Sequence, residues 1–147
     1  MQDFHPVLVG TIPIEIDIPE SDLDIICECK NLEAFKSRLM ALFSEKDHFK
    51  IEKSNVNKIP STVCNFKTKH FEFEVFGQNI PTHKQYAYRH MLIEYQLLNE
   101  KGTNLKKAII QLKKEGYKSE PAFAKLLELS GNPYEALLTL ETKRIDC

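Results

Sequence analysis

Two short stretches near the N-terminus organise the chain: Pro6-Val-Leu-Val-Gly10 and, after a spacer, Ser21-Asp-Leu-Asp-Ile-Ile-Cys27. The first predicts a short apolar strand that ends in a glycine, and residues 22–29 predict a second strand. Alternate side chains of a strand share a face, so Asp22 and Asp24 are expected to point the same way, about 6.5 Å apart along the chain. Two such carboxylates repel each other unless a cation intervenes, and their oxygens suit Mg²⁺. Solvation of both aspartates on an exposed strand face is the alternative interpretation.

The rest of the first half continues this mixed pattern. Isoleucines alternate with other residues over 12–18, which predicts a half-buried extended segment. Asn31 is expected to cap a helix, because apolar residues recur after it at helical spacing: Leu32, Phe35, Leu39, Leu42 and Phe43. Further strands are predicted over 49–53, 62–66 and 71–76, the last two forming a hairpin.

Beyond Gly77 the pattern is helical. Thr82 and Gln85 have the spacing of a capping box that opens a helix through Leu98. Three more helices are expected, one from Asn104 to Gly116, one from Ser119 to Gly131, and one that begins at Asn132-Pro-Tyr-Glu135. The sequence therefore predicts an α+β fold in a single domain over 1–147, sheet-rich over 1–78 and helical over 79–147, with a mixed sheet.

Composition narrows the class of protein. The chain has 147 residues, of which 42% are hydrophobic and 28% are charged, the balance of an ordinary globular domain. No apolar run approaches the ~20 residues that a membrane-spanning helix needs. The formal net charge of −1 argues against nucleic acid and against an anionic membrane as partners, since both usually select a basic excess.

The cysteines point to a reducing compartment. Cys27, Cys29, Cys64 and Cys147 follow no signal peptide, so we expect reduced thiols and a cytoplasmic protein. Cys27 and Cys29 have no second pair that would complete a zinc site, and buried structural cysteines are the preferred interpretation.

A third acid strengthens the metal hypothesis. The stretch Phe71-Glu-Phe-Glu-Val-Phe76 alternates without a break, which places Glu72 and Glu74 on one face of a strand. If that strand neighbours the Asp22–Asp24 strand, one glutamate can complete a three-carboxylate cluster. The alternative is an acidic face in water, paired with Lys67 or Lys69 across the hairpin.

With these motifs the sequence resembles the nucleotidyltransferase superfamily, the polymerase-beta-like fold. The resemblance lies in Gly10-Thr11, the spacer, Asp22-Leu-Asp24-Ile25 and the later strand acid. Thr11 stands where the family usually has serine, and it keeps the hydroxyl. Strings such as Val-Gly-Thr-Ile-Pro-Ile, Glu-Val-Phe-Gly-Gln and Ala-Tyr-Arg-His-Met are, more narrowly, similar to a bacterial domain-of-unknown-function family that is grouped with nucleotidyltransferases by fold.

The resemblance implies a Mg²⁺-dependent transfer of a nucleoside monophosphate from a nucleoside triphosphate, with ATP as the expected donor, to an acceptor that the sequence does not identify. It implies that Asp22, Asp24 and a third acid hold Mg²⁺ and act in catalysis. Glu74 is preferred as this acid, with Glu72 as the fallback. It also implies that Gly10, Thr11 and Ser21 contact the nucleotide phosphates. A catalytically inactive nucleotide- or partner-binding module of the same fold is the alternative function.

Several residues outside these motifs carry weaker expectations. Arg89 has the chemistry to bind a phosphate, but an ion pair with Glu94 or with an acid of the sheet is the preferred interpretation. His90 has no partner at ligand spacing, so we expect a packed or capping histidine. The lysines at positions 113, 114 and 118 are expected to form a solvated helix face.

Overall fold

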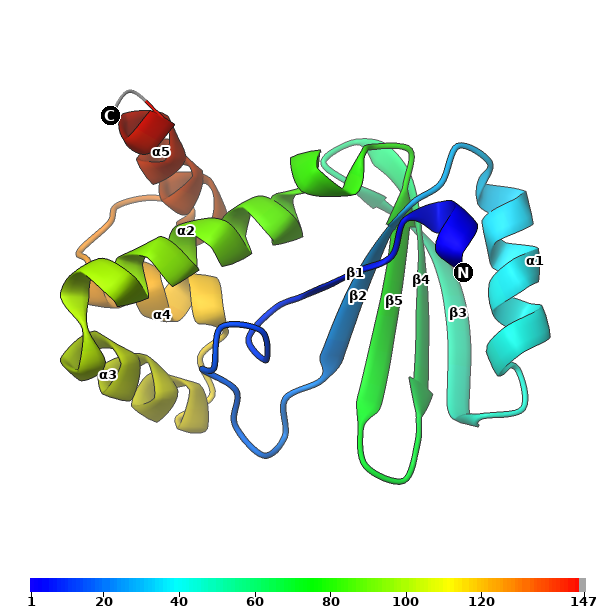
Figure 1. Cartoon of the computed structure of the whole chain (residues 1–147), viewed down its shortest axis with the longest axis horizontal. Coiled ribbons are helices and arrows are strands. Elements are labelled where there is room, and N and C mark those ends of the chain that lie inside the picture. Colours follow the sequence, from blue (N-terminus) through cyan, green and yellow to red (C-terminus); the bar gives the residue numbers. More distant parts are fainter. Residues whose placement is uncertain (146–147) are drawn as a thin grey trace. The chain divides into compact units, whose positions relative to one another are not determined.

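The computed structural model describes residues 1–145, so Cys147 lies outside the described residues. The chain forms two compact units, and each is described by itself. One unit, the sheet unit, comprises Met1–Gly10 and Asp22–Gln85. The other, the helical unit, comprises Thr11–Ser21 and the chain from Tyr86 onward. Their elements are labelled in Figure 1.

The sheet unit contains a five-stranded mixed sheet in the order β1-β2-β5-β4-β3. Its strands are β1 (Val7–Val9), β2 (Leu23–Glu28), β3 (Asp47–Val56), β4 (Ile59–Lys67) and β5 (Glu72–Gln78). β2 and β5 pair in parallel, and the other neighbouring strands are antiparallel. The unit also holds the short 3₁₀ helices η1 (Gln2–Phe4) and η2 (Thr82–Lys84).

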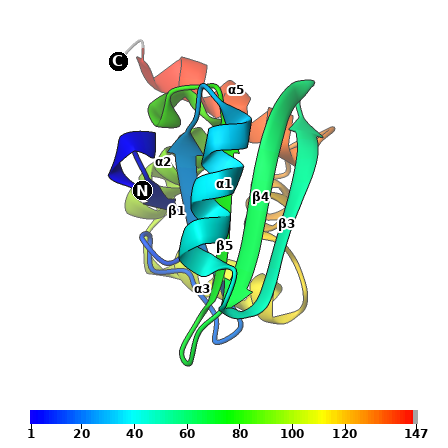
Figure 2. The ribbon, with the colours of Figure 1, turned by 90° about the vertical axis from the view of Figure 1, so that its right-hand side faces the viewer.

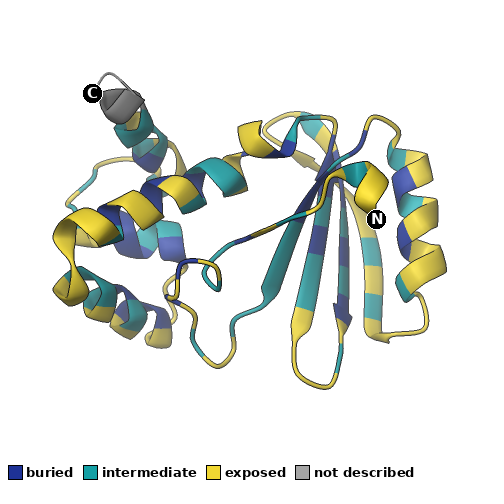
Figure 3. Cartoon of the chain, viewed as in Figure 1, coloured by how far each residue is buried: buried dark blue, intermediate teal, exposed yellow. Residues whose placement is uncertain are grey.

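One helix, α1 (Leu32–Phe43), covers one face of this sheet, as Figure 2 shows. The Asn31 side chain accepts a hydrogen bond from the Ala34 amide at 3.0 Å, which confirms the predicted cap. Phe35 and Leu39 are fully buried, and Figure 3 shows the buried residues of α1 on one side of the helix. They pack with strand residues that include Cys27, Cys29, Cys64, Phe66 and Val75. This face of the sheet is therefore the hydrophobic core of the unit.

The two hairpins follow from local sequence. Asn57 and Lys58 join β3 to β4, and both have positive φ, as a type I′ turn requires. β4 and β5 pair antiparallel, which confirms the predicted hairpin. All three strands are longer than the apolar segments that predicted them, because backbone pairing continues into polar positions that periodicity does not mark.

The helical unit consists of α2 (Tyr86–Lys101), α3 (Thr103–Lys114), α4 (Ser119–Leu126) and α5 (Pro133–Ile145). Its core draws on every one of these helices and on the Thr11–Ser21 segment, with Ile16, Ile93, Ile109, Phe123 and Leu137 among its buried members. Each of these five side chains is at most 2% exposed. The apolar stripes of the helices thus face one another within the unit.

The extended segment predicted over 12–18 is wrong. Ile14 and Ile16 are buried as the alternation implied, but the backbone forms a turn over residues 12–15, and no residue of 12–18 joins a sheet. Pro13 has no amide to donate to a strand partner, and Glu15 has φ 61°, which turns the chain. Of the alternating isoleucines, Ile14 and Ile16 are buried in the core of the helical unit.

Some helix boundaries also differ from the prediction. The capping box is wrong: α2 begins at Tyr86, and the Gln85 side chain donates to the carbonyls of Cys27 and Ile80 instead. Asn104 does not cap α3, which begins after Gly102.

The later helices agree better with the sequence. α4 begins at Ser119 as expected, but it ends at Leu126 rather than near Gly131. The Asn132 side chain accepts hydrogen bonds from the amides of Tyr134 and Glu135, which confirms the start of α5. The α+β class with a mixed sheet is confirmed. Within residues 1–145, no helix is both long enough and apolar enough to cross a bilayer.

Candidate active site

Asp24 and Glu74 lie side by side on the two parallel strands. They are Cα partners in the β2–β5 pair, so their side chains leave the same face of the sheet. Their neighbours Ile25 and Val75 pack toward α1, which places the two carboxylates on the opposite face. Both acids are half-buried. The register therefore brings together the second aspartate of the motif and the glutamate that we preferred as the third acid.

Asp22 immediately precedes β2 and is also half-buried. It stands two positions before Asp24, the spacing at which strand side chains return to the same face. Among the residues that the structure describes, no three His, Cys, Asp or Glu side chains are gathered closely enough to enclose a metal ion.

Gly10 directly follows β1 and approaches the carboxylate of Asp24. A Cβ atom built on Gly10 would lie 2.5 Å from Asp24 Oδ2, which is closer than atoms pack. Gly10 also has φ +83°, a conformation that residues with a side chain rarely adopt. The glycine of the sequence motif is thus required both by its backbone and by the carboxylate beside it.

Thr11 and Ser21 bring their hydroxyls together at the two ends of the Thr11–Ser21 segment. Thr11 Oγ1 lies 3.5 Å from Ser21 Oγ. Ser21 Oγ accepts a hydrogen bond from the Ile18 amide at 2.9 Å, and the Ser21 amide donates to the Ile18 carbonyl at the same distance. Both hydroxyls belong to the helical unit, while Gly10 and Asp22, their neighbours in the chain, belong to the sheet unit.

Glu72 is in a different environment from Glu74. Its side chain is 61% exposed, and its carboxylate lies 3.6 Å from Lys67 Nζ, its cross-strand partner. The alternative of an acidic side chain paired across the hairpin therefore holds for Glu72.

Two residues that contact β2 or β5 were not found by sequence reasoning. Asn65 is the β4 partner of Glu74, on the side away from Asp24, and a lone asparagine in a strand carries no sequence signal. Gln85 is buried and donates from Nε2 to the Cys27 carbonyl at 2.9 Å and to the Ile80 carbonyl at 3.0 Å. Gln85 is the last residue of the sheet unit, and its hydrogen bond to Cys27 holds this residue against β2. Its spacing from Thr82 had indicated a helix cap instead.

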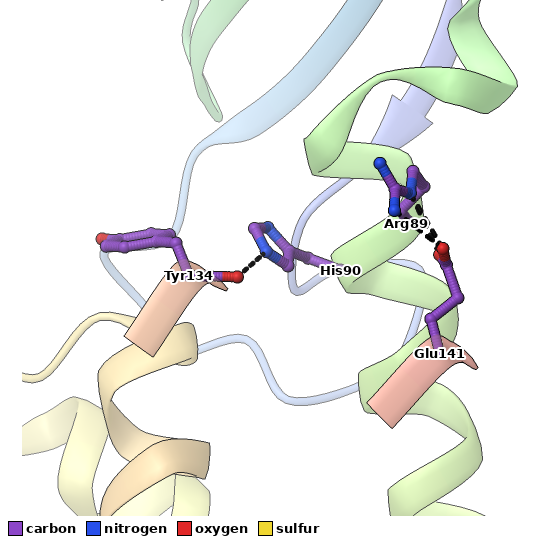
Figure 4. Close-up of polar contacts among 4 residues, drawn as sticks. All are labelled: Arg89, His90, Tyr134 and Glu141. Carbon is purple, nitrogen blue, oxygen red and sulfur yellow. Dashed lines mark hydrogen bonds and ion pairs between the residues drawn. The ribbon is translucent and has the colours of Figure 1, made fainter. Parts of the chain in front are cut away.

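Arg89 and His90 make structural contacts within the helical unit, as Figure 4 shows. Arg89 forms a bidentate ion pair with Glu141 of α5, whose oxygens accept from its Nε and Nη2 at 2.8–3.1 Å. An ion pair was expected, but with the wrong partner. His90 is buried, with Nε2 at 2.8 Å from the Tyr134 carbonyl, which confirms a packed histidine.

The three described cysteines are free and buried, as expected for structural residues. Burial, with a smaller contribution from Cys29, raises the pKa of the Cys27 thiol to about 12. Burial likewise raises the pKa of Cys29 and of Cys64 to about 11. At neutral pH these thiols are protonated, and a protonated thiol is a poor nucleophile.

A match to a protein-family model identifies the family of this chain. The model described as "Domain of unknown function (DUF4269)" matches residues 1–140, so the chain belongs to this family. The resemblance to a domain-of-unknown-function family is thereby confirmed. No curated protein matches the chain in sequence.

Solved structures of nucleotidyltransferase polymerases share the fold. The Cid1 poly(U) polymerase with Mg 3′-dATP bound is similar over 90% of this chain and 40% of that chain, with a TM-score of 0.53 at 15% identity. The polymerase core of TRAMP, an RNA surveillance complex, is similar over the same shares, with a TM-score of 0.52 at 12% identity. The chain thus spans about two fifths of these polymerase chains.

These similarities bear on two expectations. The superfamily resemblance is confirmed at the level of the fold. The expectation that nucleic acid is not a partner, which rested on net charge alone, gains no support from neighbours described as a poly(U) polymerase and as part of an RNA surveillance complex.

Proposed function

We propose that this DUF4269 protein is a Mg²⁺-dependent nucleotidyltransferase that uses a nucleoside triphosphate, ATP being the first to test. The observation that carries the proposal is the register that pairs Asp24 with Glu74, with Gly10 against the Asp24 carboxylate. The shared fold supports it, and one neighbour was solved with Mg 3′-dATP bound. A cytoplasmic location suits both the triphosphate and the three free thiols.

The available donors fit Mg²⁺ rather than a softer metal. Carboxylate oxygens are hard ligands, and Mg²⁺ typically binds one or two carboxylates together with substrate phosphates and water. Asp24 and Glu74, which are register partners, would hold it together with the substrate phosphates, and Asp22 is proposed as a further ligand once the triphosphate is bound, because the three side chains are not gathered around one point in the described structure. The absence of a side chain at Gly10 leaves the space that Asp24 Oδ2 occupies. When bound, Mg²⁺ would offset charge on the triphosphate as the leaving group departs.

The chain's own residues have separate tasks in the proposed reaction. The backbone at Gly10 permits close approach of the triphosphate, and the hydroxyls of Thr11 and Ser21 donate to its oxygens. Glu74 accepts the proton of the attacking hydroxyl. A bond forms between the acceptor oxygen and the α-phosphorus, the bond from that phosphorus to the bridging oxygen breaks, and pyrophosphate leaves.

The acceptor is a hydroxyl-bearing molecule. We retain RNA beside small molecules as acceptor classes, because net charge was the only argument against nucleic acid. A protein that binds the triphosphate but transfers nothing is the competing function, and it predicts the same ligand contacts without turnover.

Calorimetric titration of the protein with ATP, with and without Mg²⁺, tests the first step of the proposal. We expect binding that requires Mg²⁺ and is lost in Asp24→Asn. Release of pyrophosphate from labelled triphosphates, in the presence of RNA or a cell extract, then separates the enzyme from the binding module. If no triphosphate binds in a metal-dependent way, the nucleotidyltransferase proposal is wrong.

A further inference from the structure

The Thr11–Ser21 segment is here called the strap. Its middle residues are buried in the core of the helical unit. Ile16 is 0% exposed and Ile14 is 8% exposed, and both belong to the core that α2–α5 build. The Ile16 amide donates to the Thr11 carbonyl at 3.1 Å, which closes a compact turn. The two hydroxyls assigned to phosphate binding lie at the strap's ends, so their spacing depends on how the middle is held.

Lys113 makes a buried polar contact with this middle. Its Nζ donates to the Ile16 carbonyl at 2.9 Å, and the residue is only 8% exposed. The expectation of a solvated lysine face is therefore wrong for Lys113. An ammonium group is costly to bury unless it is hydrogen-bonded or paired, and so a lysine is an expensive way to fill space in a core. The ability of Lys113 to donate a hydrogen bond is therefore the property that matters at this position.

A buried carboxyl group, that of Glu94, interacts electrostatically with Lys113. Glu94 of α2 is 2% exposed, and the positive charge of Lys113 acts on it against the effects of burial and of Glu120. Lys106, two helical turns earlier on α3, also reaches the strap, but its contact is an exposed ion pair with Glu15 at 3.6 Å. Two lysines of α3 thus contact the strap, and of these two only Lys113 makes its contact in the buried core.

We propose that Lys113 is a positioning residue that fixes the strap through the Ile16 carbonyl and thereby holds the Thr11 and Ser21 hydroxyls together for a phosphate. The assignment of the phosphate rests on the proposed function. The positional role rests on the hydrogen bond, the burial of Ile14 and Ile16, and the 3.5 Å approach of the two hydroxyls.

The test compares Lys113→Met, which removes the donor, with Lys106→Met, which removes only the exposed pair. Hydrogen exchange of the strap amides, above all Ile16 and Ser21, is read against amides of α4. We expect Lys113→Met to accelerate strap exchange about tenfold while α4 changes little, since one buried hydrogen bond is lost locally. Lys106→Met is expected to change strap exchange less than about twofold.

Nucleotide affinity supplies the second readout. The Kd for Mg²⁺-ATP should rise about tenfold in Lys113→Met and stay within about twofold of the unmodified protein in Lys106→Met. Unchanged strap exchange in a folded Lys113→Met protein would overturn the proposal. Exchange that accelerates equally in α4 would show a purely structural lysine and overturn it as well.

Two further conditions distinguish a failure of the proposed function from a failure of the role proposed for Lys113. If the unmodified protein binds no triphosphate, the proposed function fails, while strap exchange still decides whether Lys113 positions the hydroxyls. If Lys113→Met does not fold, the double variant with Glu94→Gln removes both buried ionisable groups and is measured in its place. Failure of both variants to fold would assign Lys113 to general stability and overturn its positioning role.

Discussion

Asp24 Oδ2 occupies the space that a side chain at position 10 would need. A Cβ atom on Gly10 would lie 2.5 Å from that oxygen and 3.3 Å from Asp24 Cγ. The glycine at the end of β1 and the aspartate in β2 are therefore one structural feature, although they are separated in the chain. A change at position 10 should act on the Asp24 carboxylate.

Gly10→Ala should remove the response to Mg²⁺-ATP by displacing the Asp24 carboxylate. We also expect a loss of about 1–2 kcal/mol in unfolding free energy, because φ is positive there. Gly131→Ala is the matched control: its φ of +85° is almost the same as the +83° of Gly10, but nothing lies within 4 Å of its Cβ position. Thermal melts with and without Mg²⁺-ATP compare the two. A full ligand-induced shift in Gly10→Ala would contradict the assignment of Asp24.

Neutralising the proposed metal ligands should separate ligand response from stability. Asp22→Asn and Asp24→Asn are expected to leave the metal-free protein equally stable or more stable, since two nearby negative charges repel. Each should abolish the Mg²⁺-ATP shift, which we expect to be about 5–10 °C at ~100 times Kd in the unmodified protein. Glu74→Gln should behave in the same way, and Glu72→Gln should keep the shift.

The result for Glu72→Gln is the internal control for this series. Glu72 is exposed and paired with Lys67, and such pairs contribute little. Loss of the shift in Glu72→Gln with retention in Glu74→Gln would reverse the choice of third acid. If Asp22→Asn and Asp24→Asn both keep the Mg²⁺-ATP shift, the proposed metal site is wrong.

Periodicity predicted the elements well wherever burial and backbone pairing follow the same rule. It found β1, β2, the β4–β5 hairpin and α1, whose apolar positions repeat locally. It misassigned residues 12–18, because alternate isoleucines can be buried by neighbouring helices without any strand partner. It misassigned Gln85 as well, since its side chain reaches the Cys27 carbonyl, far away in the chain.

The candidate site was predictable only in its local parts. The spacing of Asp22 and Asp24 and the glycine before them can be read directly from the sequence. The choice between Glu72 and Glu74 depends on strand register, which pairs Glu74 with Asp24 and is not a local property. Lys113 did carry a signal that could have been used, because it follows Ile109 and Ile110 at helical spacing.

Gly77→Ala should destabilise the sheet unit through a clash with α1. A Cβ atom at this position would lie 2.2 Å from Phe35 Cε1, and Phe35 is 0% exposed, so its ring has no free space to enter. We expect a loss of about 3 kcal/mol in unfolding free energy, measured by urea denaturation. Adding Phe35→Leu should restore part of that loss, because the smaller side chain makes room. Strict additivity of the two changes would contradict the clash.

Glu94→Gln should stabilise the protein increasingly as the pH rises. Glu94 is 2% exposed, and Oε1 has no hydrogen-bond partner among the described residues. Burial and then Glu120 raise the pKa of Glu94 well above its ordinary 4.5, and Lys113 opposes them only in part. A raised pKa in the folded state means that the stabilising contribution of the neutral acid is complete below pH 4.5 and is lost as the pH rises through the folded value.

Glutamine mimics the neutral acid and does not titrate, so it escapes that loss. Urea denaturation at pH 4.5, 6 and 7.5 should show similar stability of the two proteins at the lowest pH and an advantage for Glu94→Gln of at least about 1 kcal/mol at the highest. Glu115→Gln, a change at an exposed position of the same unit, is the control against which the advantage of Glu94→Gln is read at each pH. If Glu94→Gln instead became less stable than the unmodified protein toward pH 7.5, Glu94 would be ionised in the folded state and paired with Lys113.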